Sequence, residues 1–301
     1  QGINLDANVE LTPESVKGRF IYAKPNFNNT ENTLFTSLTS STTDLLTDSG
    51  YKTSEIGFSL GTKFEQFQNI FLSPEIDFLI EDLETSSKAS NTLKKQEGSY
   101  TDLYFNYSIN QDLRDKRFRT ESGYQTFFTQ ELPIISDNSE LANAFEISKF
   151  KKLSTRSDTV GKISFYAKTI TGLSDDVRIS KRLNVPSSKL RGFEKGKVGP
   201  VDNKDFVGGN HVTALNLSAT LPNIVAGLDN LDVGVFLDAA NVWGVDYDSS
   251  LDDKSTIRTS TGVAFNLLTP IGPLSFSFAN ALTKASSDKT ETFRFRLGTQ
   301  F

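Results

Sequence analysis

Few side chains in this 301-residue sequence could do the chemistry that enzymes use. Cysteine is absent and the only histidine is His211. Without thiols, the sequence excludes disulfides, thiolate metal sites and cysteine nucleophiles. A serine–histidine–aspartate triad would have to use His211, and no motif positions it, while one histidine alone does not predict a metal site. We therefore expect a protein that is not an enzyme and that has no metal or other cofactor.

The charged residues do not favour a nucleic-acid or nucleotide partner. The net charge is -5 and the isoelectric point is near 5.2, whereas nucleic-acid-binding surfaces are strongly basic. The sequence contains no glycine-rich phosphate-binding loop, so ATP is not expected. The pairs Asp175-Asp176 and Asp252-Asp253 stand in polar stretches, and we interpret them as solvated loop charges.

The last eleven residues have the clearest structural pattern. Apolar and polar side chains alternate to the final residue, which is the period of a β-strand. A strand with one apolar and one polar face suits a transmembrane barrel, with lipid outside and polar groups inside. An edge strand of a soluble β-sandwich is the alternative. One face carries Phe293, Phe295, Leu297, Thr299 and Phe301, and the other carries Arg294, Arg296, Gly298 and Gln300.

The rest of the chain favours the barrel. Mean hydropathy is -0.33, and no apolar run approaches the roughly 18 residues of a membrane helix. About fourteen strands are expected, the first at residues 3–11, with no domain boundary between residues 1 and 301. The fold class predicted is therefore all-β, a transmembrane antiparallel β-barrel. The residues expected on its outer face are Leu5, Val9, Leu215, Leu217, Val233, Val235, Val263, Phe276 and Phe295.

Connections between the predicted strands fall into two classes. Short turns are expected at 13–14, 66–69, 112–116 and 269–272, and long polar loops at 85–98, 245–254 and 283–289. This pattern predicts short turns on one rim of a barrel and long loops on the other. Residues 172–210 form a still longer connection that is both apolar and basic. A loop of this length is usually functional, and we expect this one to fold back into the barrel lumen.

This long connection carries a motif. Leu190-Arg191-Gly192-Phe193 resembles the Val-Arg-Gly-Phe/Tyr motif in the sixth extracellular loop of the BamA family, the outer-membrane protein assembly factors of the bacterial surface antigen superfamily. Three further stretches resemble that family in the same order along the chain: Gly208-Gly209-Asn210 before a strand, Phe236-Leu237-Asp238 with Asn241-Val242-Trp243 behind it, and the turn and strand Leu268–Phe276.

The resemblance implies roles for individual residues. Arg191 is expected to reach the inner wall at Asp238, and Gly192 to let the loop tip pass close to that wall. Ser218 stands where the family often has an inward glutamate, and is the candidate second anchor. Gly298, in the last strand ending at Phe301, corresponds to a kink at the barrel seam.

The resemblance also implies a function. The protein would insert and assemble β-barrel proteins in the bacterial outer membrane through a weak lateral seam. Its partners would be unfolded barrel substrates, outer-membrane lipids and, through periplasmic POTRA domains, the lipoproteins of an assembly complex. The family barrel has about sixteen strands, so two strands and the POTRA domains are expected to precede residue 1.

Three other functions remain open from the sequence. A two-partner secretion transporter would share the Arg-Gly-Phe loop and export a polypeptide through the lumen. A passive porin would conduct ions. A soluble β-sandwich binding module would not need detergent to stay in solution.

Overall fold

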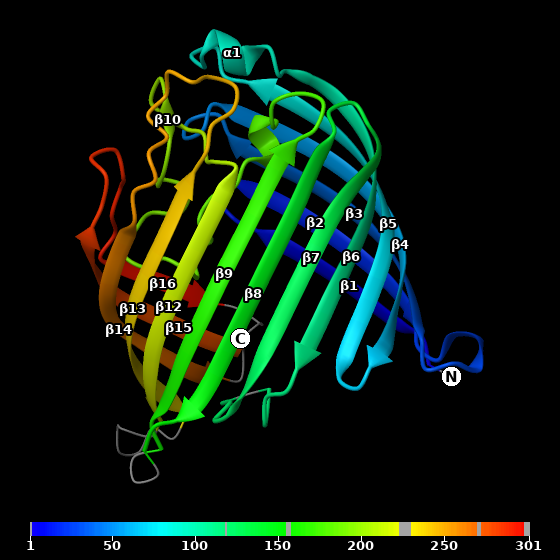
Figure 1. Ribbon diagram of the computed structural model, residues 1–301, viewed down its shortest axis with the longest axis vertical. Coiled ribbons are helices and arrows are strands. Elements are labelled where there is room, and N and C mark those ends of the chain that lie inside the picture. The colour runs from blue at the N-terminus through cyan, green and yellow to red at the C-terminus, as the bar shows by residue number, and fades with distance from the viewer. Residues whose placement is uncertain (1, 118, 155–157, 223–229, 270–271, 298–301) are drawn as a thin grey trace.

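The structure, a computed structural model, describes residues 2–117, 119–154, 158–222, 230–269 and 272–297. Fourteen strands form one antiparallel sheet in which neighbours along the chain are neighbours in space, and the sheet curves around a central space (Figure 1). The strands of this sheet are β1 Asn4–Leu11, β2 Ser15–Lys24, β3 Thr33–Leu45, β4 Tyr51–Phe67, β5 Ile70–Thr85, β6 Gly98–Asp112, β7 Gly123–Ser136, β8 Glu140–Lys152, β9 Val160–Gly172, β12 His211–Pro222, β13 Leu231–Trp243, β14 Arg258–Thr269, β15 Gly272–Thr283 and β16 Phe293–Leu297.

The remaining elements are short. They are η1 Phe27–Asn29, α1 Asn91–Lys94, η2 Ile179–Lys181 and the hairpin of β10 Val201–Asp202 with β11 Asp205–Phe206. No helix in the described ranges combines the length and the apolar composition that a membrane crossing requires.

Alternation along the strands separates an apolar outer face from a mixed inner face. On β13, Val235 and Leu237 are exposed while Phe236 and Asp238 are buried. The outward prediction is confirmed for all nine residues. Six are exposed. The other three are half-buried, and they share the outer face because they are paired with outer residues of the next strand or their ring contacts one. An exposed apolar face of this extent indicates a surface that a membrane or another protein covers. The exposed six are Leu5, Val9, Leu215, Leu217, Val235 and Phe295, and the half-buried three are Val233, Val263 and Phe276.

Most long connections gather on one rim. Because consecutive strands are antiparallel, the loops after β5, β9, β13 and β15 share a rim, where α1 lies in Figure 1. The sequence predicted short turns on one rim and long loops on the other. This separation is wrong, because the short turn at Pro13-Glu14 lies on the rim of the long loops and the longer connection 113–122 lies on the opposite rim. Glu14 is next to the long loop there: Lys195 Nζ lies 3.1 Å from Glu14 Oε2.

Residues 173–210, called the lumen loop below, connect β9 to its sheet neighbour β12. The loop buries its apolar side chains against the inner face of β8, β9, β12 and β13, so the largest apolar cluster lies between loop and wall. The prediction that this connection folds into the lumen is therefore confirmed. The loop contributes Val177, Leu183, Val185, Leu190, Phe193 and Val198, and the wall contributes Ala142, Ile170, Val212, Ala214, Ala240 and Val242.

Over the described residues, the sheet has two free edges, β1 and β16. Among the described residues, β16 pairs on one side only, with β15, from Phe293 opposite Phe278 to Leu297 opposite Leu274. This is the one-sided pairing expected for the last strand. The expected seam residues Gly298 and Phe301 lie outside the described residues.

Candidate functional site: the lumen loop and its anchors

The predicted contact between Arg191 and Asp238 is present. Arg191 Nε lies 2.7 Å from Asp238 Oδ2, Nη2 lies 2.7 Å from Oδ1, and the Arg191 backbone N–H donates to Oδ2 over 3.1 Å. The Asp238 side chain is fully buried and the Arg191 guanidinium stacks 3.4 Å from the Phe236 ring centre. A bidentate, charge-assisted pair of this kind fixes both position and orientation. We call this pair the loop latch.

The second anchor is not Ser218. In the antiparallel register Ser218 lies opposite Phe236, whereas Asn216 lies opposite Asp238. Residues that face each other in this way share one face of the sheet, so Asn216 is the side chain that meets the aspartate. Its Nδ2 donates to Asp238 Oδ1 over 2.9 Å and to the Lys189 backbone oxygen over 2.7 Å. The Asn216 amide is therefore the second polar partner of Asp238, and the prediction of Ser218, two residues further along β12, is wrong.

The other three motif residues fit the tip against the wall. Leu190 and Phe193 are 2% and 1% exposed. Gly192 has φ +85°, and a Cβ there would stand 3.1 Å from Ala279 Cβ, inside normal contact. Glycine is thus required at this position both by the backbone angle and by the close approach to β15.

A larger buried cluster surrounds Arg178, which the sequence interpretation did not single out. Arg178 is 1% exposed and donates to three carboxylates, which are Glu81 on β5, Asp102 on β6 and Glu140 on β8. The guanidinium distances are 3.2 Å to Glu81 Oε2, 2.6 Å to Asp102 Oδ2 and 3.1 Å to Glu140 Oε2. The guanidinium also stacks 4.5 Å from the Tyr100 ring centre. These four charged residues are the Arg178 cluster, and they tie the loop to β5, β6 and β8, whereas the latch ties it to β13.

A signal for this cluster was present in the strand pattern. Ile76, Phe78 and Ile80 mark the outer face of β5, which places Glu81 on the inner face. An inward carboxylate beside a long basic loop predicts an ion pair. The partner could not be chosen, because the loop carries eight basic residues with no register to the wall.

A third anchor lies in the β13–β14 loop. Asp246 accepts hydrogen bonds from the Val177 N–H over 3.0 Å, from Asn210 Nδ2 over 2.8 Å and from the Arg182 guanidinium. Burial works to raise the pKa of the Asp246 carboxyl, but the Val177 N–H and the Arg182 charge outweigh it and lower that pKa. Nearby, Asp253 Oδ2 accepts the Val245 N–H over 3.1 Å. Asp252 is exposed in this loop, as expected of a solvated loop charge, whereas Asp253 is half-buried and also hydrogen-bonds the loop backbone.

The loop tip is also joined to the last strand and to the loop before it. The Arg294 guanidinium donates to the backbone oxygens of Ser187 and Phe193, and Arg296 Nη2 donates to Ser187 Oγ over 2.7 Å. Phe193 forms a β-bridge with Thr290, and the Glu194 N–H donates to the Lys289 oxygen over 3.0 Å. The arginines of β16 thus point inward, as expected, and hold the same loop that the latch holds.

Across the described residues, no group of histidine, aspartate and glutamate side chains has the arrangement of a metal site. His211 Nδ1 lies 2.8 Å from Thr169 Oγ1, and the ring packs 5.5 Å from Trp243. The sites that the structure does bring together are ion pairs between loop and wall, which can position segments of the barrel relative to one another.

The Omp85 superfamily domain matches residues 1–301, the whole chain. The chain belongs to the Omp85 superfamily. A BamA outer-membrane assembly factor from Neisseria meningitidis is 33% identical over 141 residues, 37% of this chain and 17% of the relative. One from Neorickettsia risticii is 25% identical over 218 residues, 71% of this chain and 29% of the relative. This Omp85 chain therefore spans less than a third of those relatives.

Solved structures show the same fold. BamA from Haemophilus ducreyi lacking POTRA domains 1–3 superposes with a TM-score of 0.85 at 21% identity, covering 98% of this chain and 64% of that one. CdiB from Acinetobacter baumannii and from Escherichia coli give TM-scores of 0.50 and 0.52 at 9% and 10% identity, covering 97% and 98% of this chain and 58% and 66% of theirs. The predicted barrel fold and bacterial outer-membrane location are confirmed: this Omp85 protein is an antiparallel β-barrel whose relatives are outer-membrane assembly factors.

Proposed function

We propose that this protein inserts and assembles β-barrel proteins in the outer membrane by offering the edge of β16 to an incoming strand. The observation that carries the proposal is the Arg-Gly-Phe loop tip, which is latched to Asp238 and hydrogen-bonded to the arginines of β16. One loop therefore connects the wall to the last strand. The names of the relatives support the same function.

The mechanism follows from the cost of an unpaired edge. Backbone N–H and C=O groups without partners are unfavourable in hydrocarbon, and a free edge recruits another strand. An incoming strand can add to that edge by β-augmentation, which needs no nucleotide and no cofactor. Meanwhile the lumen loop holds β12 to β16 as one unit, because its anchors lie on β12, β13, β16 and the β15–β16 loop. We propose a non-enzymatic role on this basis.

The partners belong to the same proposal. Substrates would be unfolded β-barrel proteins, and the surrounding partner would be outer-membrane lipid. Lipoproteins of an assembly complex would bind through POTRA domains.

Vesicle reconstitution tests this function. We expect the full-length protein in phospholipid vesicles to speed the folding of a urea-denatured eight-stranded barrel, because a templated edge replaces the unpaired edge of the substrate. Folding is measured by the heat-dependent shift in electrophoretic mobility. Empty vesicles and vesicles with an unrelated porin are the controls, and folding that is no faster than in the porin vesicles would contradict the proposal.

A two-partner secretion transporter is the second candidate, because the fold likeness extends to CdiB. The TM-scores of 0.50 and 0.52 are well below the 0.85 for BamA, which favours the assembly function. In cells the two differ in product: a transporter releases a polypeptide into the medium, and an assembly factor delivers a folded barrel to the membrane.

A further inference from the structure

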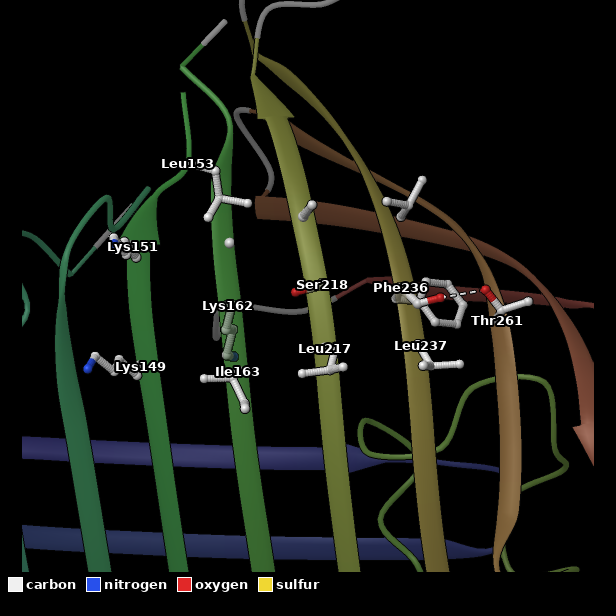
Figure 2. Close-up of a pocket in the computed structure, with 13 residues that line it drawn as sticks. Lys149, Lys151, Leu153, Lys162, Ile163, Leu217, Ser218, Phe236, Leu237 and Thr261 are labelled. Carbon is white, nitrogen blue, oxygen red and sulfur yellow. Dashed lines mark hydrogen bonds between the residues drawn. The ribbon is translucent and has the colours of Figure 1, made fainter. Parts of the chain in front are cut away.

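A shallow apolar hollow lies on the outer face of the wall, across β8, β9, β12 and β13 (Figure 2). Its floor is low at Ala219 on β12, a small residue that lies opposite Gly161 of β9. The Leu153 side chain covers Gly161, where a Cβ would stand 2.9 Å from Leu153 Cδ1. Around this floor stand the exposed larger side chains Leu153, Ile163, Leu217, Val235 and Leu237. The volume is about 590 Å³, a size that suits a segment of hydrocarbon chain.

Two lysines border the hollow on one side. Lys149 lies opposite Ile163 and Lys151 lies opposite Gly161, so both side chains share the outer face with the apolar residues. Both are exposed, and among the described residues neither has an ion pair with a carboxylate. Lys152, the next residue, faces the other way and pairs with Asp158 over 2.7 Å and with Glu121 over 3.5 Å. Within the described part of the chain, the two outer lysines are thus positive charges without a paired carboxylate, on a surface that lipid covers.

The position of the lysines along β8 places them at the membrane–water boundary. β8 ends at Lys152, on the rim opposite the one where most long loops gather. In outer-membrane barrels the long loops are extracellular, so this rim is periplasmic. Lysines near the end of a spanning element extend toward the headgroups and bury their stems along apolar surface. The charge that meets them in this leaflet is the phosphate of a phospholipid.

We propose that this hollow binds an anionic phospholipid of the periplasmic leaflet. The phosphate lies between the Lys149 and Lys151 ammonium groups, and one acyl chain lies over Ala219, beside Leu153. The lysines select for net negative charge, while the small Ala219 side chain admits the acyl chain close to the backbone. A zwitterionic phospholipid carries its own ammonium beside the phosphate, and therefore binds more weakly.

Native mass spectrometry of the full-length protein in detergent, titrated with phosphatidylglycerol, tests the site. Replacing both lysines (Lys149→Gln with Lys151→Gln) is expected to weaken phosphatidylglycerol binding about thirtyfold, from about fivefold for each lysine near an anionic headgroup. Ala219→Leu, which fills the floor and keeps both charges, is expected to reduce binding as well. Lys254→Gln with Lys284→Gln removes the same charge from exposed loops on the opposite rim and is the matched control, expected to bind as the unchanged protein does.

Three results would overturn the site. They are equal binding of phosphatidylethanolamine, equal loss in the control pair, and unchanged binding in both hollow variants. A dimer that disappears in the lysine variant while lipid binding is unchanged would also overturn it, because it would identify a second copy of this chain as the occupant. Heat-dependent mobility confirms that each variant is folded before its binding is compared.

Discussion

Replacing Arg178 with methionine is expected to lower the free energy of unfolding by about 3–5 kcal/mol, the usual cost of breaking a buried ion pair. The change leaves Glu81, Asp102 and Glu140 buried without the guanidinium that now contacts all three. Lys181 Nζ, 3.9 Å from Glu81 Oε2, is a weaker neighbour. We also expect the start of the lumen loop to become sensitive to protease, since this residue ties it to β5, β6 and β8.

Urea unfolding in lipid vesicles, followed by fluorescence of the only tryptophan, Trp243, measures this effect. The informative control keeps Arg178→Met and adds Glu81→Gln, Asp102→Asn and Glu140→Gln. Removing the stranded charges should recover most of the lost stability, because a buried charge without its partner is the costly state. If the single variant unfolds within about 0.5 kcal/mol of the unchanged protein, the normal range for surface changes, the cluster does not hold the loop.

The loop latch is expected to respond unequally to loss of its two partners. Arg191→Ala leaves the fully buried Asp238 with two neutral donors, the Asn216 amide and the residue 191 backbone N–H, and should cost about 3–5 kcal/mol because the carboxylate loses its counter-charge. Asp238→Ala leaves an arginine that is 21% exposed and can reach water, so we expect about 2–3 kcal/mol, the range for a hydrogen bond to a charged group. Both variants should slow barrel assembly in vesicles, because the loop tip no longer joins β13 to β16.

Limited proteolysis of the lumen loop and the folding rate of a barrel substrate measure the latch. Asp175→Ala is the matched control, because Asp175 is an exposed carboxylate in the same loop. The latch is contradicted if Asp238→Ala costs more than Arg191→Ala, or if the control variant slows assembly as much as either.

Alternation of side chains was enough to predict the wall. The period of two along β12, β13 and β16 identified the outer residues, because lipid on one face and polar packing on the other impose opposite demands on successive positions. The same reasoning placed Asp238 inside. Arg191 was assigned to it through the motif, since nothing in the spacing of a loop residue relates it to a strand some fifty positions away.

The predictions that were wrong or missing concern contacts that depend on strand register or on loop conformation. Choosing Asn216 over Ser218 requires the pairing of β12 with β13, which alternation does not determine, since both residues point inward. Arg178 was one of eight basic loop residues of equal appearance. The short turn at Pro13-Glu14 lies among the long loops because the antiparallel strand order places the end of β1 on that rim, where Lys195 of the lumen loop reaches Glu14.

A disulfide-trapping experiment tests the proposed edge most directly. Residues 1–301 contain no cysteine, so within them Phe295→Cys on β16 places the one thiol on the free-edged strand, and Val235→Cys places it on β13, which is paired on both sides. Full-length protein carrying either change is expressed with a barrel substrate that has one cysteine in its terminal strand. We predict a disulfide-linked complex with Phe295→Cys and none with Val235→Cys, because a disulfide requires Cα atoms within about 7 Å. Equal trapping at both positions, or trapping at β13 alone, would contradict the account.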